Sequence, residues 1–200
     1  MDTILLVDDD PAILEIFTVC LEMDGYKVLV AADGSACLNL LNTHNPDLIF
    51  LDLMMEPMDG WEILIAIRKN ASSRYIPVVI LTGKPPVPED ILQYGGLIEE
   101  YIVKPVSFPV FIESVHRNIE HDRNLRREIK QMKDNVQDPA LLAEYTHLLR
   151  FVRVAYKLKK RLMDPQWTDR IPIKNQEERL QWVHKKIGFP YPLPGQDEEK

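Results

Sequence analysis

The sequence predicts a doubly wound α/β domain, in which helices cover both faces of a parallel sheet. Short, continuously apolar runs alternate with segments of helical spacing, and this alternation occurs five times within the first 120 residues. Runs that are apolar at every position are typical of strands buried on both faces of the sheet. The five expected strands are residues 4–7, 27–31, 48–51, 77–81 and 101–103.

Segments with helical periodicity separate the expected strands. Pro11 follows Asp10, as a proline at the first position of a helix would. Apolar residues then recur on one face in two of these segments, the second of which directly follows the last strand. These residues are Ile13, Ile16, Phe17 and Cys20 in the first segment, and Phe111, Ile112, Val115 and Ile119 in the second.

Composition excludes several classes of protein. With 46% hydrophobic and 28% charged residues, the chain can form a core, and no stretch is long and apolar enough to span a bilayer. The N-terminus lacks the basic and apolar segments of a secretory signal. Cys20 and Cys37 have no metal-ligand or CxxC spacing, which favours reduced thiols. We therefore expect a cytoplasmic protein without a membrane partner.

The first 119 residues of the chain are acidic, and the remaining residues are mildly basic. Residues 1–119 contain 7 Lys and Arg against 18 Asp and Glu, a net charge of −11, whereas residues 120–200 contain 17 against 13, a net charge of +4. These values sum to the net charge of −7 for the whole chain. We expect an α/β domain at 1–121, a helical extension at 122–190 and a flexible tail at 191–200.

The extension has its own helix signals. Residues 116–137 contain neither Gly nor Pro, so the helix at the end of the first domain is expected to continue. Asp138 and Pro139 then resemble the cap and first turn of a new helix with a broad apolar stripe over 141–163. Asn175 and Glu178 resemble a capping box, which predicts a further short helix that ends at Gly188.

Polar residues follow the expected strands where a functional site would lie. In a doubly wound sheet, ligands bind beyond the carboxyl ends of the strands. Asp8 and Asp9 end the first strand, Asp52 follows the third, Thr82 follows the fourth, and Lys104 follows the fifth. Each could have an ordinary role, such as an N-cap for Asp8 or Asp9 or a surface position for Lys104. Their common edge favours one site.

This set of side chains suits phosphoryl transfer. Three neighbouring carboxylates repel one another unless a cation offsets them, and oxygen ligands suit a hard ion such as Mg²⁺. A carboxylate can also accept a phosphoryl group as an acyl phosphate, which is the role expected for Asp52. Lys104 and the Thr82 hydroxyl can then stabilise the phosphoryl oxygens.

Four sequence blocks carry a family resemblance. "VDDD", "LDLMMEPMDG", "VVILTG" and "YIVKP" occur in the order and nearly at the spacing of the receiver domain of two-component response regulators. The chain resembles that family from about residue 2 to residue 121. The resemblance implies a flavodoxin-like sheet with strand order 2-1-3-4-5, and a histidine kinase as phosphodonor.

The resemblance also implies roles for individual residues. Asp52 would be the phosphoacceptor, and Lys104 the cation of the site. Thr82 and Tyr101 would form the coupled switch. The implied Mg²⁺ ligands are the carboxylates of Asp9 and Asp52, Asp8 partly through water, and the backbone carbonyl of Met54.

The sequence differs from the family pattern in two places, and each difference leads to a prediction. Pro85, Pro86 and Pro88 prevent the fourth helix of the domain from starting before Pro88, which would make it short. Met54 and Lys84, two residues after the acceptor and two after Thr82, are poorly suited to orient an attacking water. This predicts a phosphorylated state that is long-lived for the family.

The expected output is a switched protein-interaction surface rather than an enzyme activity. The partners would be a histidine kinase, an unidentified protein target and, as further options, a second copy of the chain or the chain's own basic extension. One alternative is an atypical DNA-binding transcriptional regulator that uses Arg150 and Arg153, although no helix-turn-helix spacing is present. A phosphatase-like enzyme is the third hypothesis, disfavoured because no second acid is placed as a general acid.

Overall fold

A computed structural model describes residues 1–132, 138–162 and 170–187. Packing divides them into two units: residues 1–85 with 101–122, and residues 86–100 with the described residues from 123 onward. The second unit thus joins a segment from the middle of the chain to the C-terminal helices. The tail expected at 191–200 lies outside the described residues.

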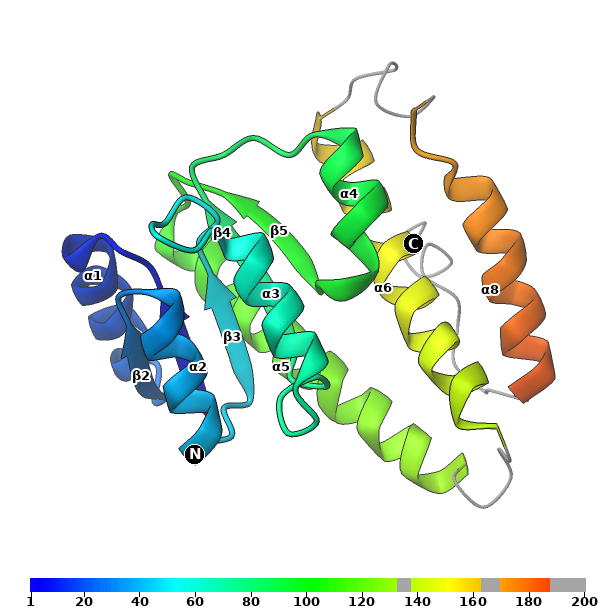
Figure 1. The fold of residues 1–200 in the computed structure, drawn as a ribbon, viewed down its shortest axis with the longest axis horizontal. Coiled ribbons are helices and arrows are strands. Elements are labelled where there is room, and N and C mark those ends of the chain that lie inside the picture. The colour runs from blue at the N-terminus through cyan, green and yellow to red at the C-terminus, as the bar shows by residue number, and fades with distance from the viewer. Residues whose placement is uncertain (133–137, 163–169, 188–200) are drawn as a thin grey trace. The chain divides into compact units, whose positions relative to one another are not determined.

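The first unit contains a five-stranded sheet in the order β2-β1-β3-β4-β5 (Figure 1). Leu5 of β1 lies between Leu29 of β2 and Ile49 of β3, and the pairs β1–β2, β1–β3 and β3–β4 are parallel. The predicted fold class and strand order are therefore confirmed. The strands are β1 Thr3–Val7, β2 Lys27–Ala31, β3 Leu48–Leu51, β4 Val78–Thr82 and β5 Glu100–Val103.

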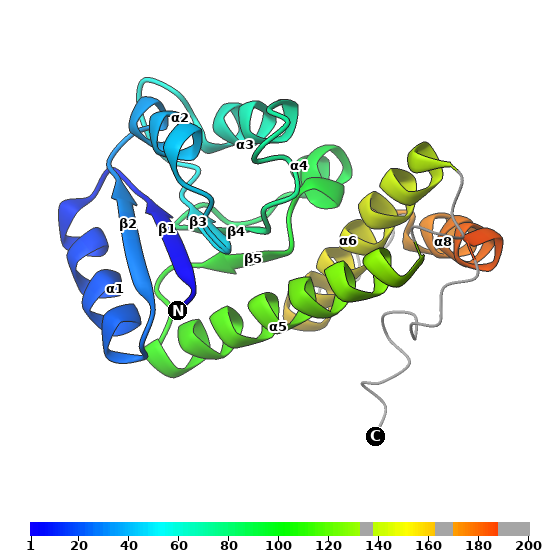
Figure 2. The same cartoon turned by 90° about the horizontal axis from the view of Figure 1, so that it is seen from below.

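Helices cover both faces of this sheet. Helices α1 and α5 lie on one face, and α2 and α3 lie on the other (Figure 2). On the first face, the ring of Phe111 lies 4.4 Å from that of Phe17 and 4.7 Å from that of Phe50, measured between centroids. Burying each such ring stabilises the fold by about 2 kcal/mol. The helices are α1 Pro11–Met23, α2 Gly34–Thr43, α3 Gly60–Lys69 and α5 Phe108–Met132.

Aspartates cap three of these helices. Asp10, rather than Asp8 or Asp9, caps α1 by accepting a 2.9 Å hydrogen bond from the Ala12 N–H. Asp33 caps α2, and Asp59 forms a capping box with Glu62 at the start of α3. Each cap stabilises its helix by about 1 kcal/mol. The cap on α1 assigns a structural role to one of the three consecutive acids.

The second unit is helical. It comprises α4 Pro88–Tyr94, the short 3₁₀ helix η1 Gly95–Leu97, α6 Pro139–Leu162 and α8 Ile173–Ile187, together with the end of α5. Helix α6 packs against η1 and α4 on one side and against α8 on another. Helix α4 begins at Pro88 and has 7 residues, as the prolines predicted.

Helix boundaries in the extension follow the sequence signals with one exception. Helix α5 continues without a break to Met132, and Asp138 accepts a hydrogen bond from the Ala140 N–H at the start of α6. However, α8 begins at Ile173, so the prediction of a cap at Asn175 was wrong. Ile171 and Ile173 are both buried, and this anchoring starts the helix before the capping pattern does.

No helix in the described ranges is long and apolar enough to cross a membrane.

Candidate functional site

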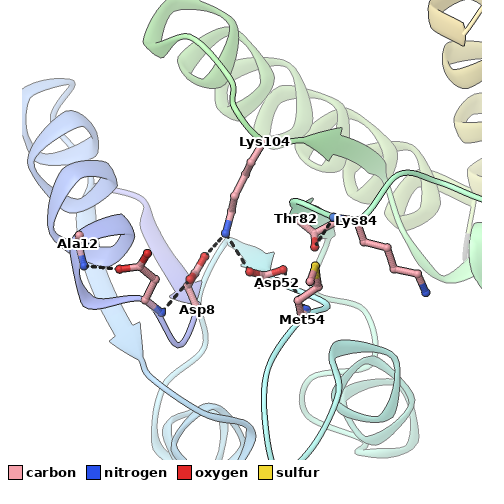
Figure 3. Close-up of polar contacts among 8 residues, drawn as sticks. Asp8, Ala12, Asp52, Met54, Thr82, Lys84 and Lys104 are labelled. Carbon is pink, nitrogen blue, oxygen red and sulfur yellow. Dashed lines mark hydrogen bonds and ion pairs between the residues drawn. The ribbon is translucent and has the colours of Figure 1, made fainter.

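Four of the predicted side chains meet at the carboxyl edge of the sheet (Figure 3). Asp8 follows β1, Asp52 follows β3, Thr82 ends β4 and Lys104 follows β5. Backbone hydrogen bonds fix their positions: the Asp52 N–H donates to the Val7 carbonyl at 2.9 Å, and the Lys104 N–H donates to the Thr82 carbonyl at 2.7 Å. The strand ladder thus continues into the site and orients these residues.

Lys104 joins two carboxylates. Its ammonium donates to Oδ2 of Asp52 at 2.9 Å and also to Oδ2 of Asp8. Burial alone would lower the pKa of Lys104, but its hydrogen bonds to Asp8 and Asp52 outweigh that effect and raise it above the ordinary value. Lys104 therefore stays charged and partly offsets the repulsion between the two acids.

Asp52 is buried but held in its charged form. Burial would raise its pKa, whereas hydrogen bonds from Thr82, Lys104 and the Met54 N–H lower it, and the net pKa is below the ordinary value. The Met54 N–H donates to Oδ1 at 3.1 Å. A carboxylate that is ionised, 6% exposed and fixed directly after a strand is well placed as a nucleophile.

Asp8 and Asp9 complete an acidic cluster with Asp52. One carboxylate oxygen from each lies within 4.8 Å of the others, with Asp8 and Asp52 buried and Asp9 exposed. Burial raises the pKa of Asp8 despite its hydrogen bonds to Lys104 and to the Asp10 N–H. Three oxygen donors at this spacing fit a hard divalent cation such as Mg²⁺. Such an ion would compensate the charge that Lys104 alone leaves unbalanced.

A hydrogen-bonded path links Thr82 to Tyr101. The Lys84 N–H donates to the Thr82 hydroxyl at 3.3 Å, and the Tyr101 hydroxyl donates to the Lys84 carbonyl at 2.9 Å. Thr82 and Tyr101 are both buried, and the Tyr101 ring packs 6.4 Å from that of Trp61. The Lys84 side chain points away from Asp52 (Figure 3). The predicted switch pair is therefore connected through the backbone of Lys84.

Gly60 supports the site, although its role was not predicted from the sequence. It is the first residue of α3, and its N–H donates to the Leu53 carbonyl at 3.1 Å. A Cβ at this position would collide with the backbone carbonyl of Asp52. Only glycine allows this close approach, which fixes the loop behind the acceptor. The signal was present in the sequence as the glycine after the capping Asp59.

Comparison with known proteins identifies the family. The response regulator receiver domain matches residues 4–116, which is more than half of the chain. The chain belongs to the response regulator receiver family.

Relatives of this receiver chain have different whole-protein descriptions. A DNA-binding dual master transcriptional regulator, RpaA of Synechocystis, is 31% identical over 142 residues, which are 71% of this chain and 59% of RpaA. A probable cyclic di-GMP phosphodiesterase of Vibrio cholerae is 33% identical over 122 residues, which are 61% of this chain and 27% of that protein. The chain therefore spans less than two thirds of these relatives.

A solved structure supports the same fold. The N-terminal domain of a response regulator receiver protein from Methanoculleus marisnigri is 46% identical and has a TM-score of 0.51. The match covers 58% of this chain and 95% of that domain. The likeness is thus to a nearly complete receiver domain.

Proposed function

We propose that the chain is a two-component response regulator in which Asp52 accepts a phosphoryl group from a histidine kinase and thereby switches a protein-interaction surface. The observation that carries this proposal is the arrangement around Asp52: an ionised carboxylate hydrogen-bonded to both Lys104 and Thr82, beside Asp8 and Asp9. It offers a nucleophile, a fixed cation, a hydroxyl donor and a set of oxygen ligands within one site.

The proposed transfer step would use this arrangement as follows. A carboxylate oxygen of Asp52 forms a bond to phosphorus while the bond from phosphorus to the imidazole nitrogen of the donor histidine breaks, and the imidazole leaves. Lys104 exchanges a carboxylate partner for one phosphoryl oxygen, and the Thr82 hydroxyl donates to another.

The metal site completes the proposal. Asp9, Asp52 and the backbone carbonyl of Met54 would hold Mg²⁺ directly, and Asp8 would contribute partly through water. The ion would supply positive charge that stabilises the phosphoryl oxygens during transfer. The supporting observation is the all-oxygen donor set of the three aspartates, whose ligand atoms lie within 4.8 Å of one another.

The switch would run through Thr82 and Tyr101. Recruiting the Thr82 hydroxyl to a phosphoryl oxygen changes its contact with the Lys84 N–H, and the Lys84 carbonyl is the acceptor of the Tyr101 hydroxyl. Binding energy at Asp52 can therefore alter the start of β5. The output target would be a protein, and a second copy of the chain is one candidate.

Phosphorylation can be tested directly. With Mg²⁺ and a small-molecule phosphodonor, the intact protein should gain the mass of one phosphoryl group, and Asp52→Asn should abolish the gain. Asp10→Asn is a matched control. Asparagine can still cap α1, and the Asp10 side chain bonds to the Ala12 N–H rather than to Asp52. Failure of the wild-type chain to gain this mass, with small donors and with histidine kinases alike, would overturn the proposal.

The output can be sought with the same chemistry. Beryllofluoride mimics the aspartyl phosphate, so a pull-down with and without it compares the two states of one protein. A partner retained in only one state, and lost from that state in Asp52→Asn, identifies the output. Equal recovery of every partner in both states would contradict a phosphorylation-controlled interaction.

DNA binding is the second candidate function. It is favoured by the relative RpaA, which is described as DNA-binding, and by the net charge of +4 over residues 120–200. As a transcriptional regulator, the chain would use the basic extension as its output.

A further inference from the structure

One face of α6 lies against the segment Gly95–Glu100 within the second unit. His147, Arg150 and Lys157 lie on this face at helical spacing, and each contacts a residue of that segment. The segment includes η1 and the first residue of β5, and it falls within the part of the chain that matches the receiver family. The extension thus contacts the receiver sequence through defined side chains.

Two glycines allow this close approach. A Cβ on Gly95 would lie 3.1 Å from Cγ2 of Ile91 and 3.3 Å from Cδ2 of Phe151, which is closer than ordinary van der Waals contact. The imidazole of His147 occupies the space that a Cβ on Gly96 would need, and His147 also forms a hydrogen bond with the Gly96 backbone. A larger residue at position 96 would therefore displace the ring, so the Gly-Gly pair shapes a seat for α6.

Buried charges fix the same contact. Glu99 is 4% exposed and binds the guanidinium groups of Arg150, itself 8% exposed, and Arg153, at 3.3 Å. Lys157 lies 3.5 Å from the carboxylate of Glu100. Neither Glu99 nor Arg150 could be buried without its partner, because an isolated charge in this environment is strongly unfavourable. The contact is therefore specific in register as well as in shape.

We propose that the segment Gly95–Glu100 is a docking site for the chain's own helix α6, and that occupancy of Asp52 weakens this docking. The docked helix covers the segment against other partners, and its release exposes both the segment and the charged face of α6. The occupant is the chain's own helix because Arg150, Arg153 and Lys157 match the two glutamates while His147 and Phe151 fill the space above the two glycines.

The docking segment is linked to the phosphoacceptor site through adjacent residues of β5. Glu100 is the first residue of β5 and Tyr101 the second, and the Tyr101 hydroxyl binds the Lys84 carbonyl. A shift of Thr82 and Lys84 therefore acts on the residue next to the glutamates that hold α6. This second half of the proposal rests on the proposed function, and linkage requires that α6 docking alters occupancy of Asp52 in return.

Docking can be tested in the full chain without any phosphodonor. Hydrogen exchange of the α6 amides reports its local opening. Glu99→Arg places three cations together and should reduce α6 protection by about 100-fold. The double variant with Arg150→Glu keeps one acid and two arginines in the cluster and should restore much of the protection. Glu113→Arg, a reversal at an exposed glutamate of α5, is the matched control and should leave α6 unchanged.

The exchange experiment supports or overturns the first part of the proposal, which is the docking of α6 on Gly95–Glu100. Protection of α6 that is equal in the wild type and in Glu99→Arg overturns docking. Failure of the double variant to recover also overturns it, provided that the amides of β1 to β4 stay protected. Protection that rises with protein concentration means that a second copy supplies α6, which overturns the intramolecular occupant.

The coupling half is tested by adding beryllofluoride and Mg²⁺. Protection of α6 should fall by about fivefold or more in the wild type and should not change in Asp52→Asn. Unchanged or increased protection in the wild type, with beryllofluoride bound, overturns the coupling. Failure to bind beryllofluoride at all would overturn the proposed function and the coupling together, while the result on docking would stand.

Discussion

At the scale of single residues, charge balance around Asp52 is the feature that most constrains the site. Lys104 is the cation seen between Asp8 and Asp52, and all three side chains are largely shielded from solvent. Removing a buried cation leaves its acids uncompensated, which costs more than the loss of an exposed ion pair. The stability of the first unit should therefore depend on Lys104.

Lys104→Met tests this dependence. In the presence of a chelator, we expect the free energy of unfolding to fall by about 3 kcal/mol, because Asp8 and Asp52 then repel each other without a counter-charge. Added Mg²⁺ should recover part of that loss by binding the acids of the native state. Urea unfolding followed by circular dichroism measures both effects. Lys69→Met, the same change at an exposed lysine, should alter stability little, and equal losses in both variants would contradict the role of Lys104.

Met54 gives a second prediction at this scale. Its side chain is 61% exposed and cannot hydrogen-bond a water strongly, so the aspartyl phosphate should be lost slowly. Met54→Asn adds an amide that can orient the attacking water, and we expect hydrolysis to accelerate about tenfold. Loss of the phosphoryl mass over time measures the rate, with Met23→Asn as an exposed control on α1. Fast loss from the wild-type protein would remove the prediction.

At the scale of elements, the start of α3 holds the loop behind Asp52. Gly60→Ala would drive a Cβ into the Asp52 carbonyl, and backbone cannot move aside as a flexible side chain can. We expect a loss of about 1–3 kcal/mol in the free energy of unfolding, together with slower phosphorylation. Gly83→Ala is the matched control, since a Cβ there would meet only the Met54 sulfur at 4.0 Å. Equal stability of the two variants would mean that the loop can relax.

Docking of α6 should depend on pH through His147. Partial desolvation of the ring and the nearby Arg150 guanidinium lower the pKa of His147 below its ordinary value, against smaller opposite effects of the Gly96 hydrogen bond and of Glu144. The docked state therefore favours neutral imidazole. Its stabilisation is complete above the ordinary pKa of about 6.5 and is lost as pH falls through the lower native value.

Hydrogen exchange of α6 measures this dependence once the intrinsic pH effect on exchange is corrected. Protection should fall between about pH 7.5 and about pH 5.5, and His147→Gln should reduce the slope. A smaller slope should remain in the variant, because burial also lowers the pKa of His184 on α8. Protection that is independent of pH in the wild-type chain would contradict the prediction.

The elements show which features of the fold follow from local sequence. The strands, the acids after them and the start of α4 at Pro88 were predictable, because apolar runs, strand ends and prolines act within a few residues. The docking of α6 was not, since Glu99 and Arg150 are 51 residues apart and Gly95-Gly96 alone resembles an ordinary turn. The start of α8 was mispredicted because burial of Ile173 outweighed the capping pattern at Asn175.

At the scale of the whole molecule, the division into an acidic and a basic part has a structural consequence. Glu99 and Glu100 belong to the receiver sequence, and they bind Arg150, Arg153 and Lys157 of the extension within one unit. Basic residues that the DNA hypothesis would use are thus engaged by the chain itself. The cations in the middle of α6 are therefore directed at glutamates, whereas those at its end are exposed.

This arrangement predicts the DNA-binding behaviour of the full chain. Exposed cations among the described residues of the extension include Lys159 and Arg161 at the end of α6 and Lys185 and Lys186 at the end of α8. Cations at helix ends can neutralise phosphates, but only side chains that reach base edges read a sequence. We therefore expect weak association with duplex DNA, without preference for sequence, whose affinity falls steeply as salt rises.

Titration of the full chain with labelled duplexes at several salt concentrations tests this expectation. The double variant Lys185→Glu, Lys186→Glu should weaken the association and reduce the dependence of its affinity on salt. With fewer phosphate contacts, binding releases fewer counterions from the DNA. Arg150→Met should not remove a phosphate contact and so should not weaken DNA binding, since Arg150 is 8% exposed and binds Glu99. Tight binding to particular sequences at physiological salt would instead favour the transcriptional regulator over the protein-interaction output. If Arg150→Met then abolished that binding, α6 would have to leave Gly95–Glu100 when the chain engages DNA.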